Sequence, residues 1–150
     1  MSNKYIAVKV ALSFSIVLFA AVVAAGLPEK TDNAYNITGC WFGSHQQAGI
    51  DGDIQNISCF KSDNTFLIRF RVIQNGRQIG EQTESGTWEL KGNIKTMVTT
   101  HINQEHLDKD QYITDRYLML GMDGSELHYE HLTSGTKYKA IRVSNEFNFP

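Results

Sequence analysis

Short runs of alternating apolar and polar residues follow one another from Ile37 almost to the end of the chain. This alternation is typical of β-strands with one buried face. The runs are separated by pairs such as Asn75-Gly76 and Asp123-Gly124, which suit two-residue hairpin turns because Gly, Asn and Asp reach the required backbone conformations easily. We therefore expect about eight strands, over residues 37–44, 53–61, 65–74, 77–91, 94–102, 111–122, 125–133 and 136–143.

The part of the chain that follows residue 27 contains no apolar pattern of helical period and useful length. The best helical candidate, residues 103–110, is short and polar. Consecutive hairpins without a crossover segment predict an antiparallel meander, and closing the meander into a barrel removes its exposed edges. The expected fold is all-β, an eight-stranded antiparallel up-and-down β-barrel over residues 36–144, followed by a tail at 145–150.

The same alternation predicts which side chains enter the barrel. In residues 65–74 it groups four apolar side chains on one face, Phe66, Ile68, Phe70 and Val72. It also places Leu118 and Leu120 inward, and it leaves residues 94–102 undecided because both faces carry apolar residues. The side chains that we expect to line the lumen and to bind a ligand are Phe60, Phe66, Phe70, Glu84, Trp88, Tyr129 and Tyr138.

The first 26 residues differ from the rest of the chain. Lys4 and Lys9 precede an uncharged run, residues 10–27, that ends in small residues. This order is typical of a secretory signal peptide, and the alternative is a retained membrane anchor. We expect a signal peptide at 1–26, a linker at 27–35, and a secreted or periplasmic barrel, or an extracytoplasmic barrel on a membrane anchor.

Without the two leader lysines the formal net charge falls from −2 to −4. Nucleic-acid binding needs clustered positive charge, so this function is disfavoured. The chain has two cysteines, Cys40 and Cys59. In an exported protein we expect them to form a disulfide, and the alternative is two buried thiols. If Trp41 points inward, its neighbour Cys40 points outward, and Cys59 must do the same.

Gly39-Cys40-Trp41 forms a G-x-W element on the first expected strand, and Arg142 lies near the end of the last strand. The chain resembles the lipocalins and the wider calycin group over about residues 37–143, including the hairpin sequences at 59–70 and 84–93, which are similar to small bacterial lipocalin-like domains. In that family a tryptophan closes one end of the barrel and an arginine lies over its ring. The resemblance implies that Trp41 and Arg142 form the barrel floor, and that a ligand binds at the other end.

The motifs of common enzyme classes are missing from the sequence, including G-x-S-x-G, H-E-x-x-H, C-x-x-C and glycine-rich phosphate loops. His128 and His131 are the densest histidine pair, but alternation puts them on opposite faces of a strand, which disfavours a shared metal. We therefore expect no catalytic residues, no metal and no cofactor.

We expect the lumen to bind a small apolar or amphipathic molecule, because the inward set is aromatic with a few polar members. The alternative is a filled barrel that binds a protein partner, as a secreted inhibitor or an envelope accessory factor. Its contacts would come from residues 45–52, from residues 103–111, or from the outward Arg69 and Arg71. A weaker third option is an enzyme of the same barrel class.

Overall fold

The computed structural model describes residues 35–47 and 49–150. The expected leader and all but the last residue of the expected linker lie outside the described residues. Within residues 35–47 and 49–150, no helix is long and apolar enough to cross a membrane.

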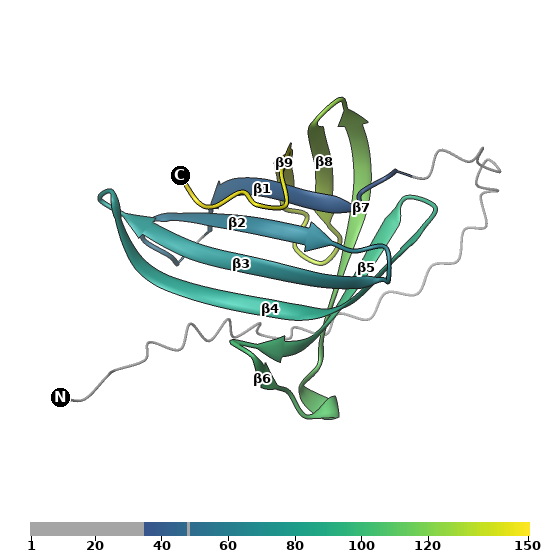
Figure 1. Cartoon of the computed structure of the whole chain (residues 1–150), viewed down its shortest axis with the longest axis horizontal. Helices are drawn as coiled ribbons and strands as arrows, with labels where there is room; N and C mark the ends of the chain where they lie inside the picture. The colour runs from purple at the N-terminus through teal and green to yellow at the C-terminus, as the bar shows by residue number, and fades with distance from the viewer. Residues whose placement is uncertain (1–34, 48) are drawn as a thin grey trace. The chain divides into compact units, whose positions relative to one another are not determined.

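The described residues form nine strands and one short 3-10 helix (Figure 1). In chain order they are β1 (Gly39–Gln46), β2 (Asp53–Phe60), β3 (Thr65–Gln74), β4 (Arg77–Lys91), β5 (Ile94–Ile102), β6 (Glu105–His106), η1 (Lys109–Gln111), β7 (Ile113–Asp123), β8 (Glu126–His131) and β9 (Lys137–Val143).

Eight of these strands close into an antiparallel barrel. The hydrogen-bonded order is β4-β3-β2-β1-β9-β8-β7-β5, and β4 also pairs with β5, which completes the circle. The first and last strands meet along Cys40–Gly43 and Ala140–Val143. The expected eight-stranded antiparallel barrel is thus confirmed, and the expected strand ends agree with the observed ones to within two residues.

The connection between β5 and β7 contains a short strand and a 3-10 helix that the sequence analysis did not predict. Residues 103–110 do not form an α-helix; β6 instead folds back onto β5, and the 3-10 helix η1 follows. Asn103 and Gln104 both have positive φ, at 50° and 69°, which makes the tight turn that returns the chain to β5. These polar residues belong to a hairpin that extends beyond the barrel wall (Figure 1).

Two local features explain how the long strand β4 fits the barrel. At its start, Asn75 and Gly76 have φ of 51° and 73°, the left-handed conformations that a tight hairpin turn between right-twisted strands needs. At its centre, the pairing with β5 shifts register between Ser85 and Gly86. A Cβ atom on Gly86 would lie 1.9 Å from the carbonyl oxygen of Val98, so this close backbone approach requires glycine.

The core fills the closed half of the barrel and follows the predicted alternation on most strands. Its buried apolar members are Ile37, Trp41, Phe60, Phe66, Ile68, Met97, Met119, Leu127 and Ala140. The expectation for β7 was wrong, because Leu120 is 45% exposed whereas Met119 is 2% exposed. Residues 117–120 are apolar at four consecutive positions, so alternation alone does not determine which face they bury.

The C-terminal residues pack on the outer face of the barrel. The Phe147 ring lies 5.6 Å from that of Phe42 on β1. Arg69 on β3 donates a hydrogen bond of 3.0 Å to the carbonyl oxygen of Phe147, and the guanidinium carbon of Arg71 lies 4.5 Å from the centre of the Phe149 ring. The tail therefore covers the two outward arginines that we considered as a contact surface for a partner.

Candidate functional site

The closed end of the barrel is built around Trp41, which is 1% exposed. Its indole nitrogen donates a hydrogen bond of 2.8 Å to the carbonyl oxygen of Ile37. The guanidinium carbon of Arg142 lies 4.2 Å from the centre of the indole ring, a distance at which a cation and an aromatic face attract each other. The structure thus brings together both residues that were predicted to form the floor. The indole of Trp41 and the guanidinium of Arg142 contact each other and neighbouring residues of the barrel.

The predicted disulfide between Cys40 and Cys59 is confirmed. The two residues face each other across β1 and β2, and their Cα atoms are 4.0 Å apart. Because Cys40 is adjacent to Trp41 on the strand, its side chain is on the opposite face. The crosslink therefore lies on the outer face of the barrel, directly beside the floor.

A cavity of about 160 Å³ occupies the other half of the lumen. His45, Gln47 and Tyr138 come from the barrel end away from Trp41, where the rings of His45 and Tyr138 meet edge-on at 5.0 Å, and Ser58 and Phe60 form the inner part. The full lining is His45, Gln47, Asn56, Ser58, Phe60, Ile68, Phe70, Lys95, Met97, Tyr117, Tyr129 and Tyr138. This composition, mainly aromatic with a few polar groups, is typical of small-molecule sites.

The volume sets the size of any occupant. Sites for drug-sized ligands enclose about 300 to 1,000 Å³, which is well above the 160 Å³ found here. An apolar cavity of about 150 Å³ in another protein binds benzene. The lumen therefore has room for a molecule with one small ring or a short chain, and a long fatty acid does not fit inside it.

Lys95 is the one lysine or arginine that lines the cavity. It is 3% exposed, and its ammonium nitrogen lies over three aromatic rings. The distances to the ring centres are 4.6 Å for Phe60, 4.5 Å for Tyr117 and 4.8 Å for Tyr129. Burial lowers the pKa of Lys95 to about 7, and the negative charge of Asp115 partly opposes this shift.

The tyrosines form a contiguous wall next to Lys95. The rings of Tyr129 and Tyr138 are stacked, with centres 5.4 Å apart, and the Tyr117 ring meets that of Tyr129 edge-on at 5.6 Å. Burial raises the pKa of Tyr117 and of Tyr129 above the ordinary value for a phenol. Their hydroxyl groups therefore stay protonated at neutral pH and are able to donate hydrogen bonds.

Two acidic side chains border this region. A carboxylate oxygen of Asp115 lies 3.2 Å from Nε2 of His131 on the neighbouring strand, within hydrogen-bonding distance. Glu84 accepts a hydrogen bond of 2.7 Å from Gln82, and burial raises the pKa of its carboxyl group. Glu84 does not belong to the cavity lining.

The seven residues predicted to line the lumen separate into two groups. Phe60, Phe70, Tyr129 and Tyr138 line the cavity. Phe66 belongs to the buried core, and Trp88 donates a hydrogen bond of 3.1 Å from its indole nitrogen to the carbonyl oxygen of Lys61, in the β2–β3 turn. Phe66, Trp88 and Glu84 therefore lie outside the cavity lining, in other parts of the barrel.

Sequence reasoning missed Lys95 and Tyr117, the two residues that most change the chemistry of the lumen. Lys95, Met97 and Thr99 alternate inward on β5 and are all at most 5% exposed. A lysine in an alternating strand ordinarily marks the solvent face, so its presence concealed the inward phase. Ile94 and Val98 make the opposite face of the strand apolar as well, so the sequence carries no signal that selects the face with Lys95.

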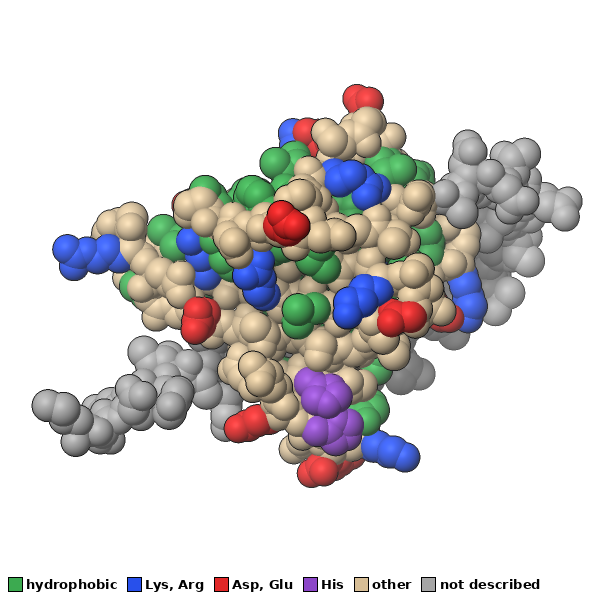
Figure 2. Space-filling model, viewed as in Figure 1, with side chains coloured by type: hydrophobic (Ala, Val, Ile, Leu, Met, Phe, Trp, Pro, Cys, Tyr) green, Lys and Arg blue, Asp and Glu red, His purple; other side chains and the backbone are tan. Residues whose placement is uncertain are grey.

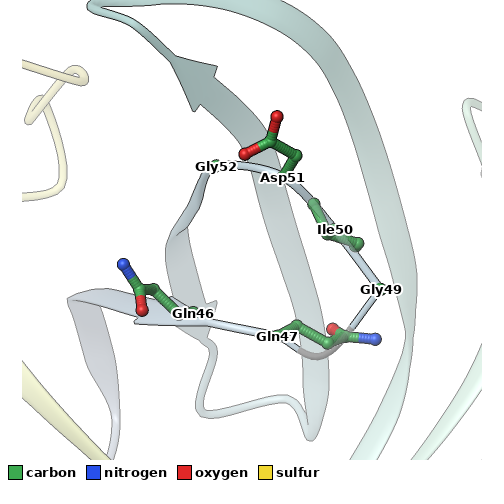
Figure 3. A pocket seen from close by; sticks show the side chains of 6 residues that line it. All are labelled: Gln46, Gln47, Gly49, Ile50, Asp51 and Gly52. Carbon is green, nitrogen blue, oxygen red and sulfur yellow. The ribbon is translucent and has the colours of Figure 1, made fainter.

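A second hollow of about 390 Å³ lies within the β1–β2 connection. It is lined by Gln46, Gln47, Gly49, Ile50, Asp51 and Gly52 (Figure 3). Although it is larger than the lumen cavity, one loop forms all of it, and Figure 3 shows that its polar side chains point away from one another. Converging groups are what a specific site needs, so we assign the candidate site to the lumen.

Histidines gather outside the barrel wall, at the β5–β6 hairpin (Figure 2). Nδ1 of His106 lies 3.2 Å from Nε2 of His101. His128 is bound to Glu126 at 2.8 Å, away from this pair. In the described part of the chain, no three His, Cys, Asp or Glu side chains are grouped so as to hold a metal ion.

Comparison of the sequence with protein-family models gave no match, and comparison with curated proteins gave none either.

Proposed function

We propose that this chain is an exported lipocalin-like barrel that binds a small amphipathic molecule in its lumen and does not act as an enzyme. The observation that carries the proposal is the cavity at the end away from Trp41, with an aromatic wall and a few polar groups. The disulfide and the apolar leader sequence support export. The cation-π pair of Arg142 and Trp41 supports the lipocalin-like relationship.

The alternative of a protein-binding module receives less support. Arg69 and Arg71 are engaged by the C-terminal residues through hydrogen bonds and ring contacts. A partner that used this face would have to displace the tail first. The 45–52 and 103–111 loops remain as the candidate contact regions of this alternative.

Binding is tested by titrating the disulfide-bonded protein with benzyl alcohol and benzene while NMR records the methionine methyl groups. Met97 lines the cavity, whereas Met122 is 37% exposed on β7, so it serves as an internal control. We expect saturable shifts at Met97 and none at Met122. If the Met97 signal stays unchanged up to the solubility limit of both probes, the proposed binding in the lumen is wrong.

A pair of variants checks that the probe enters the lumen. Ser58→Leu adds volume to a residue of the cavity lining, whereas Ser44→Leu makes the same change at an exposed position of β1. We expect the first variant to weaken probe binding by about tenfold or more, which corresponds to about 1.4 kcal/mol. Equal affinities in the two variants would place the probe elsewhere.

A further inference from the structure

Lys95 has an unusual environment for a buried cation. Three aromatic faces surround its ammonium group at 4.5 to 4.8 Å. Ring faces stabilise a cation only in part, and a buried charge without an anionic partner costs several kcal/mol. The lysine is therefore expected to have a role that an apolar residue of similar size would not fulfil.

No carboxylate of the described residues reaches Lys95. The ion pairs within residues 35–47 and 49–150 join other groups. Asp115 acts on Lys95 through its charge without an ion-pair contact, and its carboxylate contacts His131. Lys95 nevertheless lines the 160 Å³ cavity. The missing partner of the ammonium group therefore has space inside the lumen.

We propose that the lumen selects small monocarboxylates, with the carboxylate bound by Lys95 and the apolar part packed against the aromatic wall. This inference rests on the proposed function, because it names the ligand class of the same cavity. A carboxylate supplies the charge that Lys95 lacks, and charge-assisted hydrogen bonds are among the strongest that proteins form. Tyr117 and Tyr129, whose rings face the ammonium group, carry hydroxyl groups that are further donors of the cavity lining.

The same geometry disfavours the other ligand charges. The aromatic faces that could bind a cation are already covered by the ammonium group of Lys95. A cationic molecule would therefore be repelled by the like charge. A neutral molecule of the same shape would leave the ammonium group unpaired. The lumen should therefore distinguish charge more sharply than shape.

Binding should also be coupled to protonation, because only the ammonium form of Lys95 attracts a carboxylate. Burial gives this group a pKa of about 7, so the affinity should decrease as the pH rises above 7. Other titratable groups face Lys95 or lie close to it, and they must be separated from its effect; these are His45 on β1, Glu84 on β4, Asp115 and Tyr117 on β7, Tyr129 and His131 on β8, and Tyr138 on β9.

The test compares benzoate with benzamide, its neutral analogue, by calorimetric titration of the disulfide-bonded protein. At pH 6.5 we expect benzoate to bind about tenfold or more tightly than benzamide. Above pH 7 the affinity for benzoate should fall by up to about tenfold per pH unit, whereas that for benzamide should stay constant.

Lys95→Met removes the charge and keeps most of the volume, and Lys91→Met makes the same change at an exposed lysine of β4. The first variant should lose the preference for benzoate and its pH dependence, because a carboxylate without a cationic partner is costlier to bury than a neutral amide. This result also separates Lys95 from the histidines, and the second variant should match the wild type. If the Lys95 variant does not fold, the preference of the wild type for benzoate over benzamide still decides. Equal binding of benzoate and benzamide by the wild type would overturn the inference and leave the proposed function standing. If benzoate, benzamide and benzyl alcohol all fail to bind, both the inference and the proposed function are overturned.

Discussion

Arg142 lies over Trp41, with 4.2 Å between its guanidinium carbon and the centre of the indole ring. The same side chain donates hydrogen bonds of 2.7 Å to the carbonyl oxygen of Thr38 and 2.8 Å to that of Asn36. One residue of the last strand thus holds both the indole and the segment that leads into the first strand.

Replacing this arginine should therefore loosen the barrel floor. We expect Arg142→Met to lower the free energy of unfolding by about 1 to 3 kcal/mol, because the change removes two charge-assisted hydrogen bonds and the contact with the ring. Urea denaturation followed by tryptophan fluorescence measures the loss. Arg77→Met, at the exposed first residue of β4, is the control, and equal stabilities of the two variants would show that the contacts of Arg142 contribute nothing.

Reduction of the disulfide should cost about 3 kcal/mol, because the crosslink joins residues that are 19 apart in sequence and restricts the unfolded chain. Denaturation with and without a reductant measures this difference. A double variant with alanine at positions 40 and 59 provides the control, since the chain has two cysteines and the reductant then has no target. A wild type that is equally stable in both conditions would contradict the expectation.

Gly86→Ala should be among the most damaging single changes in the sheet. The added methyl group would lie 1.9 Å from the carbonyl oxygen of Val98, and this atom belongs to the backbone, so β4 and β5 would have to separate. We expect a loss of about 2 to 4 kcal/mol in the free energy of unfolding. Gly80→Ala on the same strand meets nothing nearer than 4.0 Å and should stay within about 0.5 kcal/mol of the wild type; similar losses at both positions would refute the steric argument.

Lys95 should make stability depend on pH between about 7 and 10.5. In the unfolded chain the pKa of this ammonium group has its ordinary value of 10.5, and in the barrel burial lowers it to about 7. Between these values the unfolded state holds one more proton, so the free energy of unfolding rises with pH, by up to about 1.4 kcal/mol per unit.

The Lys95→Met variant lacks this pH dependence. Denaturation of both proteins at pH 6, 7.5 and 9 measures the difference between their free energies of unfolding at each pH. The free energy of unfolding of the variant should be highest relative to that of the wild type at pH 6. This difference should decrease above pH 7. An unchanged difference from pH 6 to 9 would mean that the lysine titrates normally in the folded state.

The barrel was predictable from the sequence because its signals are local. Turn pairs such as Asn75-Gly76 fix where strands end, and Trp41 next to Cys40 fixes which face is inside. The chemistry of the lumen was less predictable, since Lys95 has a side chain that normally faces water and is buried here among rings from three other strands. Residues 117–120 are apolar on both faces, so which of them enter the barrel depends on the register with β8, where the pairing shifts between Met119 and Gly121.

The barrel has two different junctions at its first strand. The disulfide ties β1 to β2 covalently, whereas β1 and β9 meet only along Cys40–Gly43 and Ala140–Val143. When the native state opens locally, β1 should stay attached to β2, and the circle should part between β1 and β9. Because Arg142 bridges that junction, it would control how often the wall opens and hence how quickly backbone amides of β9 exchange with solvent.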